Sequence, residues 1–353
     1  LPAFPASVVR PFDFDRDGDM DLFVGARVKK EAFPFAGESY LLINEGGAFT
    51  AAGATGFDLG MVTDAVWTDY NGDGWEDLLI VREWNSVVFL ENRQGQQLSP
   101  VEMETLNYKR GFWSAVAAGD FDGDGDDDYI LGNLGENHRF HISEEWPMRL
   151  YATDLDDNGV IDPVVTAYWK DETGVMQEYP VNYLDELGAQ SPFFRKMFTS
   201  YTRFSYTGMD SILDKSSVRD DQLFTANATA SYLLWNENGT FEWERLPRQL
   251  QVAPIKEMLV RDFNGDGHLD ILTAGNDYTY DVSTGFYDAN KGLLLLGNGD
   301  RSFRILSSAE SGLLLQGQVE SLLFFEGERS FLVAGMNRDS VRVYQHTVRN
   351  LLN

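Results

Sequence analysis

A nine-residue acidic pattern occurs five times along this chain and limits what it can fold into. The pattern is Asp-x-Asp/Asn-x-Asp/Asn-Gly-x-x-Asp, and its copies cover residues 13–21, 69–77, 120–128, 154–162 and 262–270. Oxygen-bearing side chains at alternate positions, a Gly for the sharp turn and a closing carboxylate are what a bound Ca²⁺ ion requires. One acidic turn is weak evidence, but five copies in one register predict a repeated calcium-binding loop.

The candidate metal ligands occupy positions one, three, five, seven and nine of each copy, with position seven acting through its backbone carbonyl. They are Asp13, Asp15, Asp17, Asp19 and Asp21; Asp69, Asn71, Asp73, Trp75 and Asp77; Asp120, Asp122, Asp124, Asp126 and Asp128; Asp154, Asp156, Asn158, Val160 and Asp162; and Asp262, Asn264, Asp266, His268 and Asp270. About five Ca²⁺ ions are therefore expected as cofactors.

The loops are not EF-hands, because an EF-hand places a bidentate Glu at position twelve and flanks its loop with helices. Position twelve holds Val24, Ile80, Leu131, Val165 and Thr273 in the five copies. Short aliphatic and β-branched runs lie before and after the loops, for example at 7–10, 21–25 and 77–81. Such runs are typical of buried strands. Each copy is thus interpreted as strand, loop, strand.

Further hairpins are predicted at 40–50, 232–243 and 293–303, where Asn-Gly or Gly-rich turns separate apolar runs. Four antiparallel strands per repeated unit are typical of a β-propeller blade. Six first strands are predicted, at 7–12, 64–68, 114–119, 148–153, 256–261 and 319–325. In the sixth unit residues 326–329 replace the acidic loop, so we expect no metal there.

On these loops and hairpins the chain resembles the FG-GAP/VCBS repeat proteins, whose propeller is shared with integrin α-subunits. It is most similar to their bacterial cartilage-acidic-protein-like branch, which is associated with ASPIC/UnbV modules. The resemblance implies an all-β β-propeller, part of a seven-bladed ring, with Ca²⁺ loops joining the first two strands of each blade on one rim. It also implies an exported, Bacteroidetes-like protein at the extracellular or outer-membrane surface, where outer-membrane transport complexes are among the expected partners.

Composition narrows the classes of partner. The formal net charge is −28, and five Ca²⁺ ions would return ten charges and leave about −18, which repels nucleic acid. There is no Cys, so no disulfide scaffold is possible. No run approaches the length of a membrane span, and the chain starts at Leu1 without a leader, which favours a mature fragment of a longer precursor.

One single domain over 1–353 is expected, interrupted by an insertion at 170–230 within the fourth unit. Helical apolar spacing occurs there at 183–187, 192–198 and 209–213. Two interpretations stay open: a helical cap packed on the propeller, or a platform for a ligand or partner.

The segment 276–288 is predicted to join the second and third strands of the fifth blade. Its aromatic residues Tyr278, Tyr280, Phe286 and Tyr287 suit either a glycan- or peptide-contacting loop or an ordered filler of the propeller mouth.

No catalytic residue is singled out, because no nucleophile elbow, phosphate-binding loop or distinct carboxylate pair stands out. The function expected is therefore a non-enzymatic Ca²⁺-binding module that binds a protein or glycan. The alternative is a Ca²⁺-dependent polysaccharide lyase or glycoside hydrolase.

Overall fold

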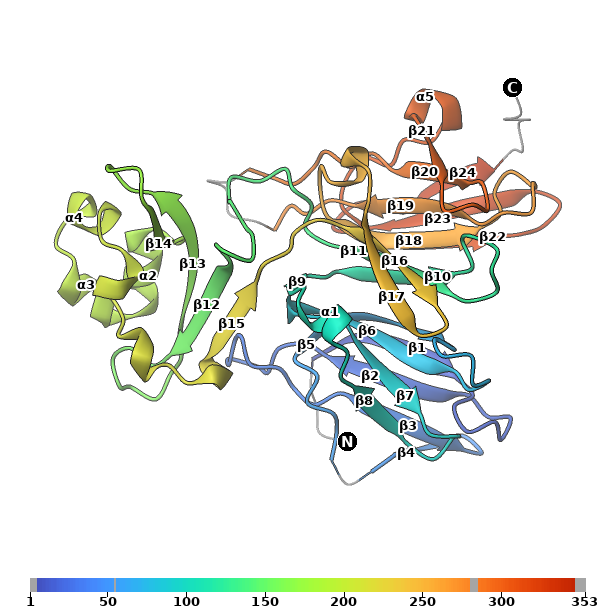
Figure 1. The fold of residues 1–353 in the computed structure, drawn as a ribbon, viewed down its shortest axis with the longest axis horizontal. Helices are drawn as coiled ribbons and strands as arrows, with labels where there is room; N and C mark the ends of the chain where they lie inside the picture. Colours follow the sequence, from blue (N-terminus) through green and yellow to red (C-terminus); the bar gives the residue numbers. More distant parts are fainter. Residues whose placement is uncertain (1–4, 54, 280–284, 347–353) are drawn as a thin grey trace.

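A computed structural model describes residues 5–53, 55–279 and 285–346 of this chain. The described part is all-β, with six antiparallel sheets and a few short helices, and its architecture is that of a β-propeller with a partly helical insertion (Figure 1). Five sheets stack as blades, and the sixth lies to one side of the stack.

Blades 1 and 2 are built from consecutive strands. Blade 1 contains β1 (Ala6–Phe12), β2 (Asp21–Ala26), β3 (Tyr40–Glu45) and β4 (Ala48–Ala51), paired in that order. Blade 2 contains β5 (Met61–Thr68), β6 (Asp77–Asn85), β7 (Val88–Asn92) and β8 (Leu98–Val101); α1 (Glu104–Asn107) follows, and β9 (Gly111–Phe112) pairs with β6. The hairpin predicted at 40–50 is thus confirmed as β3–β4.

The remaining blades follow the same plan with one interruption. Blade 3 pairs β10 (Ala115–Gly119), β11 (Asp128–Gly132), β16 (Tyr232–Glu237) and β17 (Thr240–Arg245). After η4 (Arg248–Leu250), blade 4 pairs β18 (Ile255–Arg261), β19 (Asp270–Gly275), β20 (Leu293–Gly297) and β21 (Phe303–Leu306). After α5 (Ser308–Ser311), blade 5 has β22 (Val319–Phe325), β23 (Ser330–Met336) and β24 (Arg342–His346).

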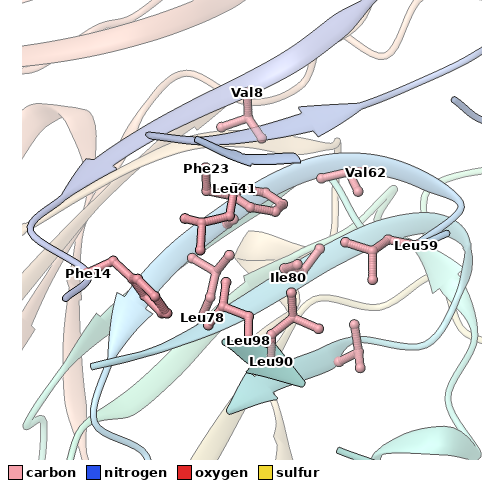
Figure 2. Packing of buried hydrophobic residues seen from close by; sticks show 12 residues of the cluster. Val8, Phe14, Phe23, Leu41, Leu59, Val62, Leu78, Ile80, Leu90 and Leu98 are labelled. Carbon is pink, nitrogen blue, oxygen red and sulfur yellow. The ribbon is translucent and has the colours of Figure 1, made fainter. Parts of the chain in front are cut away.

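The second strands of blades 2, 3 and 4 are apolar on both faces because each lies between two cores. In β6, Leu78 and Ile80 point into the core shared with blade 1, while Leu79 and Val81 point into the core shared with blade 3. Successive side chains of a strand alternate between faces, so a sheet covered on both sides needs an unbroken apolar run. Figure 2 shows the first of these cores, with Val8 and Phe23 of blade 1 facing Leu78 of blade 2.

Hydroxyl groups at the start of the first strands join neighbouring blades. Ser7 donates to the Val62 carbonyl at 2.7 Å, Thr63 to the Trp113 carbonyl at 2.8 Å and Ser114 to the Ile255 carbonyl at 2.6 Å. The third of these bonds runs directly from blade 3 to β18. Blade 4 therefore follows blade 3 in the stack, although more than a hundred residues separate Ser114 from Ile255 in sequence.

The chain leaves blade 3 after β11 and returns at β16, and this excursion contains the sixth sheet. Its strands are β12 (Met148–Thr153), β13 (Asp162–Lys170), β14 (Met176–Pro180) and β15 (Leu223–Ala226), in the order β14-β13-β12-β15. Between β14 and β15 lie α2 (Leu184–Gln190), α3 (Pro192–Met197), α4 (Tyr201–Ser205), η1 (Met209–Ser211), η2 (Lys215–Ser217) and η3 (Asp220–Gln222).

The insertion sheet is covered on its two faces by different partners. The helices pack on Tyr151 and Val164, whereas Met148 and Leu150 pack against Met61 and Trp84 of blade 2. The two ends of the excursion meet where the Gly135 amide donates to the Thr229 carbonyl at 2.8 Å.

This arrangement differs from the sequence expectation of an insertion at 170–230 inside a fourth blade. The strand predicted at 148–153 exists as β12, and the predicted helical segments exist as α2, α3 and η1. However, β12 lies between β13 and β15 rather than at the inner edge of a blade, so the whole excursion interrupts blade 3. The loop spacing could not show this, because a strand-loop-strand hairpin has the same sequence pattern in either sheet.

Candidate metal centres

Each acidic loop joins the two strands of a hairpin, β1–β2, β5–β6, β10–β11, β12–β13 or β18–β19. The five loops share one backbone conformation. The Gly at position six has φ of +98° at Gly18, +84° at Gly74, +102° at Gly125, +85° at Gly159 and +92° at Gly267. This left-handed region disfavours side chains with a Cβ, which explains why position six is Gly in every copy.

The first Asp of each loop closes the turn by accepting a hydrogen bond from the amide of position six. The distances to Oδ2 are 3.2 Å for Asp13, 2.8 Å for Asp69, 3.2 Å for Asp120, 2.7 Å for Asp154 and 2.9 Å for Asp262. In each bond a side-chain carboxylate accepts from a backbone amide five residues further along the chain and so closes the whole loop. The sequence therefore folds the loop around its first carboxylate.

The closing Asp at position nine is buried in every copy, with Asp21, Asp77, Asp128 and Asp270 at 0 % exposure and Asp162 at 2 %. In blade 3, Asp128 accepts from the amide of Phe121 at 3.2 Å and from that of Asn236 at 2.9 Å. Amides of the third strands bind the other blade carboxylates in the same way: Asn44 binds Asp21, Asn92 binds Asp77 and Gly297 binds Asp270. The closing Asp thus joins the loop to the third strand, a role that sequence reasoning missed.

Three buried carboxylate oxygens in these loops have no hydrogen-bond partner: Oδ1 of Asp13, Oδ2 of Asp77 and Oδ1 of Asp156. A buried carboxylate oxygen without a partner is costly. These atoms sit where a divalent cation would supply the missing interaction, so the residues present fit a calcium ion.

Carboxylate oxygens within 4.8 Å of one another form four groups in the described residues. They are Asp13, Asp15 and Asp17; Asp120, Asp122 and Asp128; Asp122, Asp124 and Glu237; and Asp154, Asp156 and Asp162. The Asp69 and Asp262 loops carry Asn instead of Asp at position three. In the described residues, neither loop forms a group of three carboxylates within this distance.

Position-seven side chains turn away from the loop centre. Asp19 Oδ2 accepts from the Gly46 amide at 2.9 Å, and Asp126 Oδ2 accepts from the Asn238 amide at 2.7 Å. These orientations agree with a role for position seven through its backbone carbonyl. The two hydrogen bonds also join the loop to the outer hairpin of the same blade.

Two residues outside the motif reach the Asp120 loop and were not predicted. Glu237 is the last residue of β16, and Arg301 of blade 4 donates from Nε to Asp122 Oδ2 at 2.7 Å. Glu237 lies beside the turn of an outer hairpin and Arg301 lies in such a turn, and only the pairing of distant strands brings them to the loop.

Burial raises the pKa of Asp77 and of Asp128 to about 7, and the neighbouring loop carboxylates add to the effect. Backbone amides of Asn92 and Asn236 oppose it. Without a cation, the carboxylates of each loop therefore destabilise one another's charged form.

The five acidic loops lie in two different parts of the fold. Four loops lie at the ends of first strands in blades 1 to 4, whereas the Asp154 loop belongs to the insertion sheet. There, Ser191 at the N-terminus of α3 donates to Asp156 Oδ2 at 3.2 Å.

The repeat seen in these hairpins corresponds to a known family model. An FG-GAP-like repeat matches residues 13–80 and 69–131, a stretch that includes the Asp13, Asp69 and Asp120 loops. The matched stretch contains FG-GAP-like repeats. Such repeats form protein-interaction and scaffold modules built as β-propellers, which agrees with the stacked sheets.

Two curated relatives extend the similarity. The chain is 26% identical over 235 residues to the human T-cell immunomodulatory protein and 25% identical over 238 residues to the mouse protein of that name. Each match covers 60% of this chain and 38% of the relative. The matches support the repeat family and not its bacterial branch in particular.

Solved structures give only loose superpositions. A BBS1N–ARL6DN complex soaked with lead matches at 10% identity with a TM-score of 0.26, covering 98% of this chain and 93% of that one. The Vibrio cholerae biofilm matrix protein Bap1 matches at 10% identity with a TM-score of 0.32, covering 96% and 76%. The architecture therefore rests on the strand pairing given above.

The aromatic residues of the β19–β20 connection have different surroundings. Tyr278 and Phe286 are exposed and contact each other edge-to-face with centroids 5.3 Å apart, while Tyr287 is buried beside Leu134 and Ala253. Tyr280 lies outside the described residues. Across the part of the chain that the structure describes, no helix is long and apolar enough to cross a membrane.

Proposed function

We propose that this chain is an exported, calcium-stabilised interaction module that presents a protein- or glycan-binding surface. The observation that carries the calcium proposal is the common geometry of the five loops, with a left-handed Gly, a first Asp closing the turn and a buried closing Asp. Calcium would neutralise the clustered carboxylates. The chain's own contribution is to hold those carboxylates in place through amides of the loop and of the third strand.

Export is proposed because loops of moderate affinity fill at extracellular millimolar calcium, while cytosolic calcium would leave them largely empty. A bacterial cell surface and an outer-membrane transport complex as partner stay predictions of the sequence resemblance.

The calcium proposal is tested by titrating chelator-treated protein calorimetrically with Ca²⁺ and, separately, with Mg²⁺. We expect about five Ca²⁺ per chain with dissociation constants on the order of 10⁻⁴ to 10⁻³ M, and weaker Mg²⁺ binding because Mg²⁺ demands a smaller octahedral site. Asp13→Asn should remove one equivalent, whereas the surface control Glu104→Gln should remove none. No calcium heat, or equal binding of Mg²⁺, would contradict the proposal.

The interaction surface is proposed on the side of the molecule away from the rim loops. The long connections after second strands, including the whole insertion, emerge at the opposite ends of the blade strands from the four rim loops. Long connections on a rigid scaffold are where binding residues concentrate.

The insertion offers a groove on this side that suits sugar rings. It has a volume of about 330 Å³ and is lined by Trp169, Tyr179, Phe204 and Tyr206 with Asp171 at its edge. Aromatic faces beside polar acceptors are suited to glycan contact.

Replacing residues 136–228 by a short Gly-Ser turn tests the role of the insertion, because the Gly135–Thr229 hydrogen bond already joins its ends. We expect the blades to remain folded and binding on a glycan array to be lost, with Trp169→Ala giving the same loss in the full chain. Unchanged array binding by both variants would show that the insertion is not the glycan surface.

A further inference from the structure

A cavity of about 660 Å³ lies where the first strands of all five blades converge. Its wall includes one residue from the start of each first strand: Ser7, Thr63, Ser114, Lys256 and Glu320. The four rim loops lie at the other ends of these strands, so the cavity belongs to the side from which the long connections emerge. Its volume is within the range of small-molecule sites.

The hydroxyl donors in the wall are already used. The hydroxyls of Ser7 and Thr63 each lie within hydrogen-bond distance of two carbonyls, one in their own blade and one in the next. The Ser114 hydroxyl donates to the Ile255 carbonyl. A hydroxyl has a single hydrogen to give. These groups therefore offer a ligand only acceptor capacity.

The basic side chains in the wall are also paired. The pairs are Arg10 with Asp64, Arg27 with Glu83 at 2.6 Å, and Lys256 with Asp277 at 2.5 Å. Arg10 Nε additionally donates to the Ala65 carbonyl at 2.6 Å. Each pair joins two different strands or a strand and a connection, so all three cations serve the fold.

Two carboxylates in the wall have no cation of their own. Among the residues that the structure describes, Glu257 and Glu320 form no ion pair, and Glu320 accepts only from Gln318. Glu257 is partly buried, which raises its pKa to about 7; the charges of Asp64 and Glu320 add to this, while the charge of Arg10, which is paired with Asp64, opposes it. Carboxylates from blades 2, 4 and 5 thus act on one another across the cavity.

We propose that this axial cavity binds an organic cation, an ammonium or guanidinium group, held between Glu257 and Glu320. The free capacity of the wall is for accepting hydrogen bonds, and its acidic groups outnumber its basic groups by five to three, so a ligand with several donors and a positive charge is complementary. The same chemistry is offered by a free amine and by a Lys or Arg side chain of a protein. This proposal deepens the interaction role above and rests on it.

The test is a calorimetric titration of the calcium-loaded full chain, with calcium content measured in the same sample. Agmatine represents the free cation, the blocked peptide acetyl-Gly-Arg-Gly-amide represents a protein side chain, and its citrulline analogue is the neutral isostere. The cavity variant is Glu257→Gln with Glu320→Gln. The control variant, Glu104→Gln with Glu145→Gln, removes the same charge at exposed positions outside the cavity.

We expect at least one cationic probe to bind, the citrulline peptide not to bind, and the cavity variant to lose affinity by about tenfold or more. Binding of agmatine identifies a free cation as the ligand source, and binding of the peptide alone identifies a protein side chain. Glu320→Gln alone changes an exposed position, so it should fold normally and lose part of the affinity. It separates loss of binding from misfolding of the double variant. Calcium-replete protein that binds neither cation, or binds equally in the cavity variant, would overturn the cavity proposal and leave the calcium proposal intact.

Discussion

The β10–β11 hairpin of blade 3 and the β12–β13 hairpin of the insertion carry the same nine-residue loop but build different sheets. In blade 3 the closing Asp128 also accepts from Asn236 of the third strand, and the Asn236 side chain donates to the Tyr70 carbonyl of blade 2. In the insertion, Ser191 at a helix start occupies the neighbourhood of the loop instead. The loop therefore specifies a hairpin with a candidate metal site, while the third strand decides whether that hairpin becomes a blade.

Removing calcium is expected to have the largest effect and to act on both regions. An ion present at a hundredfold excess over its dissociation constant stabilises the fold by about 2.7 kcal/mol per site. With four rim loops, we expect a chelator to lower the melting temperature by at least about 10 °C. Differential scanning calorimetry with restored Ca²⁺ as control measures this. A melting curve unchanged by chelator would mean that calcium stabilises neither the blades nor the insertion.

Replacing the closing Asp separates the two regions. Asp128→Asn loses acceptor capacity toward two buried backbone amides and should cost about 2–3 kcal/mol, whereas Asp162→Asn, which accepts from the Leu155 amide, should cost about 1 kcal/mol. Urea unfolding followed by tryptophan fluorescence measures both. Equal costs would mean that the third strand adds nothing to the blade carboxylate.

Asparagines at the ends of third strands test the contact between blades. Asn236→Ala removes the bond to Tyr70 of blade 2 and should cost about 1–2 kcal/mol. Asn44→Ala is the matched control, because its side chain donates to the Met20 carbonyl within its own blade and that bond is exposed to solvent; it should cost less than about 1 kcal/mol. The same urea experiment compares them, and a larger cost for Asn44→Ala would reverse our assignment.

A further expected effect is a change in pH dependence. The pKa of Asp77 and of Asp128 rises from 3.8 to about 7 on folding without metal. Because folding favours their protonated form, their contribution to stability is complete below about pH 4 and is lost as the pH rises to about 7. Calcium binds the deprotonated form. The melting temperature in chelator should therefore fall between pH 5 and 7.5 while the calcium-induced increase grows; a calcium increment that shrinks with rising pH would contradict this.

Much of the fold could be predicted because the loop pattern is local. The hairpins around residues 13–21 and 262–270 need only the Gly at position six and the flanking apolar runs, and both formed as expected. The assignment of 148–153 to a blade could not be checked in this way, because it depends on which distant strand pairs with β12.

The residues of the candidate metal centres also differ in how far they could be predicted from the sequence. The first Asp of each loop acts within its own turn, so its role can be predicted from the sequence. Glu237, Arg301 and the third-strand amides reach the loops only through long-range strand pairing. The axial cavity was not predicted for the same reason. Its carboxylates Glu257 and Glu320 come from different sheets, and no sequence spacing relates them.

The central claim is that the acidic loops hold calcium and thereby fix the blades. The most direct test is the bound calcium at equilibrium: the protein is dialysed against a buffer containing about 10 mM calcium, well above the expected dissociation constants, and inductively coupled plasma mass spectrometry measures the excess calcium on the protein side. The account predicts about five calcium ions per chain, falling by one in Asp13→Asn. Less than one calcium ion per chain in folded protein would contradict it.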